Sequence, residues 1–278
     1  MAKLASDAAT RSFREKHRAL YSSERECARY DAEICRNQGV AALLAAIEAV
    51  HPLQQQFHVV DAGCGTGKLA RLLAPRVSRV SAFDRAADCL AVAREASPPN
   101  VTYAEADLRR LPVADGCADV ACAGWALSYL KAEHEEWYAD GSYGGAWRDE
   151  VDAALGELDR ALGDGGVAVI FETQGTATEA PRRGGSHLYA HLRDRGFTES
   201  CVRTDYTFPT PAAALETLTF FFGKGVASRA AELLRGAPPD EPCTVPECTG
   251  VWVRRKRPRV RVRIRAAGPC DVVCEIGA

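Results

Sequence analysis

The 278-residue sequence lacks any apolar run that approaches the roughly 20 residues needed to cross a bilayer. Near its start, Asp7 and Glu15 interrupt the apolar residues, so this segment has no signal-peptide core. An excess of either charge is also missing, because 35 Lys and Arg residues stand against 37 Asp and Glu residues. We therefore expect a soluble, cytoplasmic protein with no membrane partner and no nucleic-acid partner.

The 11 cysteines have no repeated spacing. Three of them lie in stretches that we predict to be buried: Cys64, Cys117 and Cys122. The simplest interpretation is a reducing compartment in which cysteine serves as a small apolar filler, with no metal bound. The pairs Cys243/Cys248 and Cys270/Cys274 leave zinc or a disulfide as the alternative, but structural zinc pairs usually have tighter spacing and nearby histidines.

From residue 51 onward, short apolar stretches alternate with helical patterns. We predict strands over residues 57–61, 77–84, 101–106, 118–123, 166–172, 198–208 and 249–255. We predict helices over residues 68–73, 86–96, 147–162 and 187–195, and over part of 211–234. Strands separated by helices imply right-handed crossovers and a parallel sheet covered on both faces. The expected fold class is therefore α/β, with a Rossmann-like, seven-stranded, mostly parallel sheet.

Four segments fall outside this alternation. Residues 7–50 have apolar residues at helical intervals, and Pro52 ends the helical pattern. Residues 131–146 are rich in glycine and are predicted to form a loop, as is the proline-rich segment 235–248. After Lys256, arginines alternate with apolar residues, which is typical of a strand with one basic face.

The most informative segment is a strand that enters three alternating glycines, Gly63, Gly65 and Gly67, and then a helix. Glycine allows a positive φ and lets a ligand approach the backbone. The N-terminus of the helix would present unpaired N–H groups to a carboxylate or phosphate.

Three interpretations of this glycine loop compete. A dinucleotide-binding loop has the pattern G-x-G-x-x-G, but Lys68 stands where its last glycine belongs. A P-loop begins with glycine and ends with a hydroxyl residue, but Ala62 and Leu69 occupy those positions. The third is a tight turn without a ligand, which rarely needs three glycines and a preceding acid.

The segment Asp61-Ala62-Gly63-Cys64-Gly65-Thr66-Gly67 resembles the first motif of class I S-adenosylmethionine-dependent methyltransferases. Within that family it is most like the small-molecule enzymes of the ubiquinone and menaquinone biosynthesis group. The resemblance covers about residues 20–255. It implies S-adenosylmethionine as cofactor, and a division into an N-terminal helical lid (1–50), a methyltransferase domain (51–256) and a C-terminal basic strand extension (257–278).

The resemblance also implies roles for residues that follow the next strands. Asp84 would accept hydrogen bonds from the ribose hydroxyls, and otherwise is a solvated strand end. Asp107 would accept from the adenine amino group beside the Leu108 N–H, and otherwise caps a turn. Gly124 and Trp125 would border the methionine part of the cofactor, although Trp125 could equally be a core residue.

The lid adds Tyr21 and Tyr30 as candidates, with core packing as their alternative role. The complete set of implied cofactor-binding residues is Tyr21, Tyr30, Asp61, Gly63, Cys64, Gly65, Gly67, Asp84, Arg85, Asp107, Leu108, Gly124, Trp125 and Tyr129.

Methyl transfer from a sulfonium is an in-line displacement, so it needs alignment in a dry site and no catalytic triad. An acceptor that must lose a proton also needs a base, for which His134, Glu172 and His187 are the candidates, unless they serve only in packing.

We expect a small-molecule acceptor, because the lid, the 131–146 loop and the helix around 215–222 are insertions of the kind that enclose a pocket. The alternatives are a non-catalytic cofactor-binding protein on the same fold, or an RNA or protein methyltransferase recruited through the Arg257–Arg265 strip. We interpret that strip as a half-buried edge strand.

Overall fold

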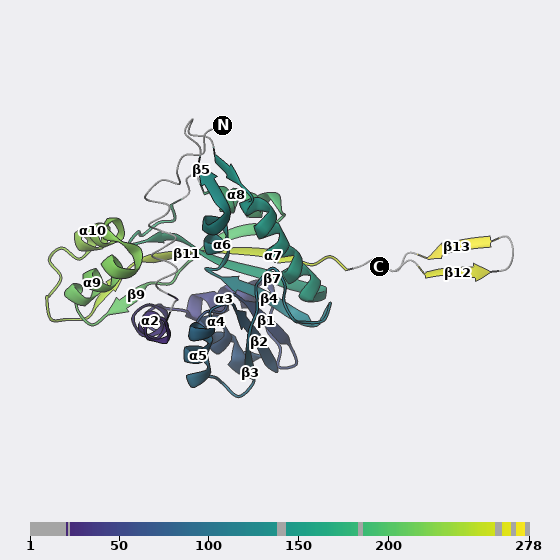
Figure 1. Ribbon diagram of the computed structural model, residues 1–278, viewed down its shortest axis with the longest axis horizontal. Coiled ribbons are helices and arrows are strands. Elements are labelled where there is room, and N and C mark those ends of the chain that lie inside the picture. The colour runs from purple at the N-terminus through teal and green to yellow at the C-terminus, as the bar shows by residue number, and fades with distance from the viewer. Residues whose placement is uncertain are drawn as a thin grey trace.

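A seven-stranded sheet lies at the centre of the protein (Figure 1). The structure is a computed structural model that describes residues 21, 23–137, 143–182, 186–258, 263–267 and 271–275. The strand order is β3-β2-β1-β4-β7-β11-β8. Only β11 in this sheet runs antiparallel to its neighbours, so the predicted mostly parallel, seven-stranded sheet is confirmed.

The strands of the sheet fall close to their predicted places, except that the strand predicted over 198–208 is divided into β8 and β9 (Tyr206–Phe208), and β9 belongs to another sheet. Their bounds are β1 His58–Ala62, β2 Arg79–Asp84, β3 Val101–Glu105, β4 Ala118–Gly124, β7 Leu162–Thr176, β8 Thr198–Arg203 and β11 Glu247–Arg255. Strand β1 is buried along its whole length, which is what a central parallel strand requires.

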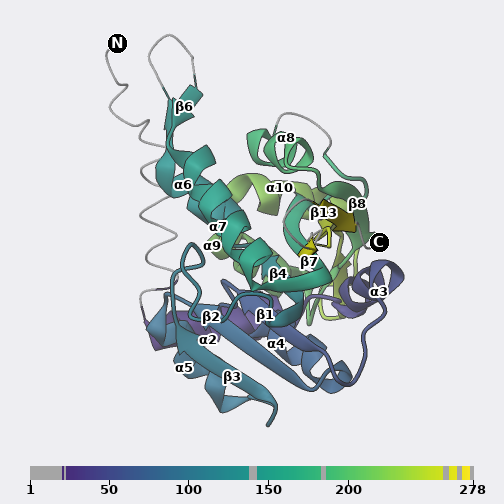
Figure 2. The same ribbon diagram turned by 90° about the vertical axis from the view of Figure 1, so that its right-hand side faces the viewer.

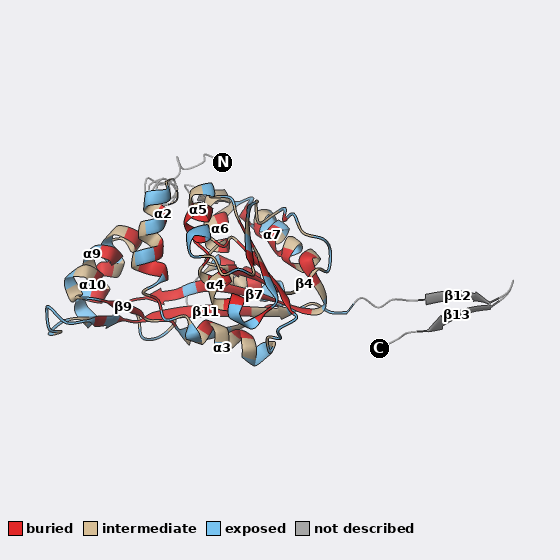
Figure 3. Cartoon of the chain, turned by 90° about the horizontal axis from the view of Figure 1, so that it is seen from below, coloured by how far each residue is buried: buried red, intermediate tan, exposed pale blue. Residues whose placement is uncertain are grey.

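Helices cover both faces of the sheet, as the sequence predicts (Figure 2). One face packs against α6 (Leu127–His134), α7 (Trp147–Ala161) and α8 (His187–Asp194). The other face packs against α3 (Ala41–Val50), α4 (Lys68–Leu73) and α5 (Ala87–Glu95). Buried residues follow the sheet and the inward sides of these helices (Figure 3).

The helical pattern predicted over residues 7–50 is confirmed for most of its described part, which is divided into separate helices. Residues 1–20 and 22 lie outside the described chain, and the elements before β1 are α2 (Glu24–Tyr30), a π-helical turn (Asp31–Cys35) and α3. Between the last two, Gln38 forms a β-bridge with Tyr206, and the Gly39 N–H donates to the Asp205 carbonyl at 2.9 Å. Backbone pairing with a distant segment therefore replaces the helical hydrogen bonds.

Two predicted loops are partly regular. In 131–146, α6 continues to His134, and β5 (Glu135–Trp137) pairs with β6 (Tyr143–Gly145), while 138–142 lie outside the described residues. In 235–248, β10 (Cys243–Val245) pairs with β9 (Tyr206–Phe208).

Helices α9 (Pro211–Phe222) and α10 (Lys224–Leu233) pack with β9 and β10 as a separate cluster. Gly223, with φ of +86°, ends α9 and begins α10. The side chains of Leu218 and Phe221 are buried in this cluster, so they serve the core rather than the walls of a pocket.

The basic tail forms a hairpin of its own. Strand β12 (Arg263–Ala267) pairs antiparallel with β13 (Asp271–Glu275), and in the described residues neither joins the central sheet. Strand structure is confirmed for 263–265. Residues 259–262 lie outside the described chain, and the structural role of the strip stays a prediction.

No helix in the described part of the chain is long and apolar enough to cross a membrane.

We expect Phe171→Ala to reduce the free energy of unfolding by about 3–5 kcal/mol, because it leaves a cavity beneath the central sheet. Phe171 is completely buried in β7 and stacks with Trp125. Leu233→Ala is the control, because Leu233 is 44% exposed and its truncation should change stability by less than about 0.5 kcal/mol. Chemical denaturation measures both, and equal effects would contradict the packing role of Phe171.

Candidate active site

A pocket of about 520 Å³ opens at the carboxyl ends of β1, β2 and β4. This is the edge at which open α/β sheets bind ligands. Most of the implied cofactor residues line it: Tyr21, Tyr30, Gly63, Cys64, Gly65, Asp84, Arg85, Asp107, Leu108, Gly124, Trp125 and Tyr129. Asp61 and Gly67 do not line it.

The three glycines of the loop have different tasks. All have positive φ, at +76° for Gly63, +53° for Gly65 and +84° for Gly67. A Cβ at Gly63 would lie 2.6 Å from Ala126 Cβ, so the fold itself requires glycine there. A Cβ at Gly65 would meet no atom within 4 Å, so this position opens into the pocket. Its backbone is therefore accessible to a ligand.

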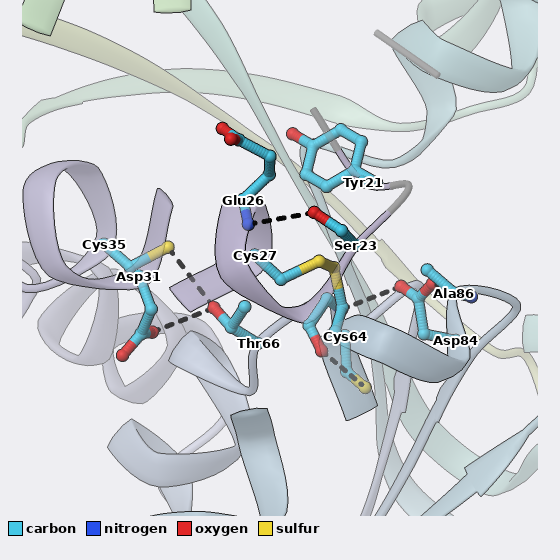
Figure 4. The surroundings of a disulfide bond; sticks show 12 residues. Tyr21, Ser23, Glu26, Cys27, Asp31, Cys35, Cys64, Thr66, Asp84 and Ala86 are labelled. Carbon is cyan, nitrogen blue, oxygen red and sulfur yellow. Dashed lines mark hydrogen bonds between the residues drawn. A yellow bond between two sulfur atoms is a disulfide. The ribbon is translucent and has the colours of Figure 1, made fainter. Parts of the chain in front are cut away.

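The Asp84 carboxylate fixes the glycine loop. Its oxygens accept from the Gly65 N–H at 2.7 Å and from the Ala86 N–H at 2.9 Å (Figure 4). Burial raises the pKa of Asp84 above its usual value. Asp84 thus sits between the loop and the start of α5, at the pocket wall, and is not a solvated strand end.

Two ion pairs lie beside Asp84 on the same side of the pocket. Arg85 Nη1 donates to Glu133 at 2.8 Å, and Arg109 Nε donates to Asp107 at 2.8 Å. The hydrogen bonds from Arg109 lower the pKa of Asp107. Asp107 also accepts from the Arg109 N–H, so it caps a turn while lining the pocket.

Aromatic hydroxyls form the wall opposite. The Tyr21 and Tyr129 hydroxyls lie 3.0 Å apart, and the Tyr21 ring meets the Tyr30 ring edge-on with centroids 5.6 Å apart. Burial raises the pKa of Tyr129 to about 12 and those of Tyr21 and Tyr30 well above their usual value. All three hydroxyls are therefore protonated at neutral pH.

The N-terminal segment is held over the pocket by polar and covalent links. Asp31 accepts from the Thr66 hydroxyl at 2.9 Å (Figure 4) and from Arg71 at 2.7 Å. A disulfide joins Cys27 of α2 to Cys89 of α5. For these two cysteines, the expectation of a free apolar filler is wrong.

The cysteines singled out from the sequence are free thiols where the structure describes their side chains. Cys64, Cys117 and Cys122 are free, as expected, and so are Cys243 and Cys248. The side chains of Cys270 and Cys274 lie outside the described residues.

Trp125 stands where β4 leaves the sheet. It has a positive φ of 53°, and its N–H donates to the Phe171 carbonyl at 2.6 Å. Its ring both stacks with Phe171 and faces the pocket. Trp125 therefore packs against the sheet and also lines the pocket, and its contact with the cofactor stays a prediction.

Asp61 lies beneath the loop, completely buried beside the Cys122 thiol. Burial raises its pKa to about 7. Gly67 also has a structural role in the loop, because it packs against Tyr103. A Cβ at this position would lie 2.5 Å from the Tyr103 hydroxyl oxygen.

None of the candidate bases lines the pocket. The His134 Nδ1 lies 3.9 Å from Glu150, and the His187 ring stacks on Tyr143 with centroids 4.2 Å apart. Glu172 is completely buried and accepts from the Ser128 N–H and hydroxyl at 3.0 and 2.7 Å. Burial raises its pKa to about 7. Glu172 therefore stabilises the first turn of α6.

The sequence reasoning missed pocket residues that carry no motif signal of their own, such as Cys35, Thr66, Lys68 and Cys89. In the sequence argument Lys68 serves only to exclude a dinucleotide-binding loop, because it stands where the last glycine of that pattern belongs. Its place directly after the third glycine, at the start of the helix, could have marked it as a pocket residue.

Comparison with known proteins supports the same interpretation of the loop. Residues 59–166 match a methyltransferase domain family. A malonyl-[acyl-carrier protein] O-methyltransferase of Pectobacterium atrosepticum is 34% identical over 142 residues, 51% of this chain and 46% of that protein. A protein of the same name from Serratia marcescens is 30% identical over 144 residues, 52% of this chain and 48% of that protein.

A solved structure shares the fold. Haemonchus contortus phosphoethanolamine N-methyltransferase 2, in complex with phosphomonomethylethanolamine and S-adenosylhomocysteine, aligns with a TM-score of 0.54 at 17% identity. The alignment covers 89% of this chain and 60% of that one. The chain spans about half the length of the curated relatives it matches.

We expect Gly65→Val to weaken S-adenosylhomocysteine binding by at least about tenfold, roughly 1.4 kcal/mol, because the side chain would enter the pocket. Gly236→Val is the matched control. Gly236 also has a positive φ, +84°, and open space at its Cβ, but it does not line the pocket. Calorimetry measures both affinities, and unchanged binding by Gly65→Val would show that the ligand does not approach this loop.

We expect the free energy of unfolding of the wild type to fall as the pH rises from about 4.5 to about 7. That of Glu172→Gln should not show this fall, because glutamine does not ionise. The folded-state pKa of Glu172 is raised, so its contribution to stability is full below the unfolded pKa. It is lost as the pH rises to the folded pKa, because the unfolded chain releases a proton that the buried carboxyl still holds. The difference should reach up to about 3 kcal/mol.

Chemical denaturation across this range measures the effect. Glu179→Gln is the control, because Glu179 is exposed and its substitution should show no such pH window. A difference between wild type and Glu172→Gln that does not change with pH would disprove the ionisation of Glu172.

Proposed function

We propose that the chain, whose residues 59–166 match a methyltransferase domain family, uses S-adenosylmethionine to transfer a methyl group to a carboxylate of a small acceptor. The observation that carries the choice of acceptor is that none of the candidate bases His134, Glu172 and His187 lines the pocket. The tyrosine hydroxyls and the Cys35 thiol do line it, and their burial raises their pKa values, which keeps them protonated at neutral pH.

The pocket fits S-adenosylmethionine by its own features. Gly65 leaves open space at the backbone, and the buried Asp84 carboxylate lies at the pocket wall beside it. A carboxylate in this place suits the two hydroxyls of a ribose, and the Ala106–Leu108 segment suits the flat, apolar face of a base. The volume lies within the range of small-molecule pockets.

When bound, S-adenosylmethionine supplies an electrophilic methyl group on a sulfonium. The protein contributes alignment and a dry surrounding. Tyr21, Tyr30 and Tyr129 close one side of the pocket, and the links from Asp31 to Thr66 and Arg71 hold the segment that carries Tyr30 in place. These contacts support a site that excludes water from the acceptor.

A carboxylate needs no base. Carboxylic acids of ordinary pKa are ionised at pH 7, so an oxygen lone pair is already available. That oxygen forms the new bond to the methyl carbon while the carbon–sulfur bond breaks and its electrons stay on sulfur. The products are a methyl ester and a neutral thioether, and no proton has to move. Alcohol or amine acceptors would need a base, and His134, Glu172 and His187 lie away from the pocket.

The relatives' names point to the same acceptor class. The curated relatives are O-methyltransferases of malonyl-[acyl-carrier protein], whose acceptor is the free carboxylate of a thioester. A malonyl thioester is therefore the first acceptor to test here, as one member of the class of small carboxylates.

We expect the protein to convert malonyl-coenzyme A to its methyl ester in the presence of S-adenosylmethionine, as measured by mass spectrometry. Acetyl-coenzyme A, which has no free carboxylate, should remain unmethylated, and Gly65→Val should be inactive. Binding of S-adenosylmethionine without transfer to malonyl or other short carboxylate thioesters would refute the carboxylate proposal. Absence of binding would refute the methyltransferase function itself.

A further inference from the structure

Lys68 places a positive charge inside the pocket, on the side of β4. The side chain extends from the start of α4 and is half-buried. Its ammonium lies 3.9 Å from the centroid of the Trp125 ring and donates to Gln38 Oε1 at 2.6 Å. The contacts with Trp125 and Gln38 therefore hold the Lys68 ammonium near the carboxyl end of β4.

Gln38 is itself fixed, so the position of the ammonium is defined. The Gln38 amide donates to the Thr204 hydroxyl at 2.8 Å, and the Thr204 and Thr249 hydroxyls lie 2.6 Å apart. These groups are buried. The chain Thr249–Thr204–Gln38 thus fixes the Gln38 amide oxygen and, through it, the Lys68 ammonium.

The other charged residues of the pocket already have partners. Arg85 pairs with Glu133, Asp107 pairs with Arg109, and Asp84 accepts from backbone N–H groups. Within the described ranges, no carboxylate lies within 4 Å of the Lys68 ammonium.

Two acids, Asp31 and Glu247, act electrostatically on Lys68 without forming an ion pair with it. Asp31 is bonded to Thr66, Arg36 and Arg71. Glu247 accepts from Thr173 at 2.6 Å through one carboxylate oxygen, and its other oxygen has no hydrogen-bond partner among the described residues. Burial lowers the pKa of Lys68 below its usual value, against the opposing influence of Glu247 and Asp31. An ammonium has three donors, and the described contacts use one of them with Gln38. A buried charge of this kind gains most from an anionic ligand.

We propose that Lys68 binds a carboxylate of the ligand at the β4 side of the pocket. This inference rests on the proposed function. Asp84 and Asp107 follow β2 and β3, whereas Lys68 lies beside β4, so the pocket has acids at one end and a cation at the other. That distribution matches a ligand with a nucleoside at one end and a carboxylate at the other.

Two carboxylates can reach this position. One is the amino-acid carboxylate of the cofactor, and the other is the carboxylate of the acceptor. The shared chemistry is an ion pair with a charge-assisted hydrogen bond. The two sources are separable, because 5′-methylthioadenosine has the nucleoside and the sulfur but lacks the amino acid.

The test compares wild type with Lys68→Met, which keeps a chain of similar length and removes the charge. Calorimetry measures the affinity for S-adenosylhomocysteine and for 5′-methylthioadenosine. We expect Lys68→Met to weaken S-adenosylhomocysteine binding by about tenfold to a hundredfold and to leave 5′-methylthioadenosine within about twofold. Lys224→Met is the control, because Lys224 is exposed outside the pocket and its substitution should change neither affinity.

A second pattern would assign the acceptor carboxylate instead. Both nucleoside affinities would then stay unchanged in Lys68→Met, while the KM for malonyl-coenzyme A would rise at least about tenfold. Equal weakening of both nucleosides, or no change in any of the three quantities, would overturn the proposal. Failure of wild type to bind either nucleoside would instead refute the proposed function on which it rests.

Discussion

The buried carboxylate of Asp31 is the contact on which the arrangement of the site depends. It joins the N-terminal segment to the glycine loop through Thr66 and to α4 through Arg71, and it also pairs with Arg36. Burial acts to raise the pKa of Asp31, and the arginine charges together with the hydrogen bonds hold it below its usual value. The residue is 2% exposed, so this carboxylate would be costly without its partners.

The strands and the glycine loop could be predicted because their signals are local. Short apolar stretches define β1, β2 and β4, and the spacing of Gly63, Gly65 and Gly67 needs only a strand before it and a helix after it. The break near Gly39 could not be predicted in this way. Its cause is the pairing of Gln38 with Tyr206, a contact between segments far apart in the sequence.

In the candidate site, too, residues with a local sequence signal could be predicted, whereas residues placed by contacts between distant segments could not. Residues that follow strands at the expected edge, such as Asp84 and Trp125, line the pocket. The histidines His134 and His187 were chosen by proximity in sequence to strand ends, and their side chains lie against Glu150 and Tyr143. Lys68 has no motif of its own, and its position becomes evident only from Gln38 and Trp125 around it.

The disulfide between Cys27 and Cys89 closes a covalent ring of the chain. This ring includes β1, the glycine loop and α4. A helix held only by packing can diffuse away when it detaches, whereas a tethered helix remains at a high effective concentration next to its docking surface. Opening of α2 would then be followed by rapid return to the same place. Reduction of the bond would remove this tether, and the Tyr30 side of the pocket would then depend on packing and on the hydrogen bonds of Asp31 alone.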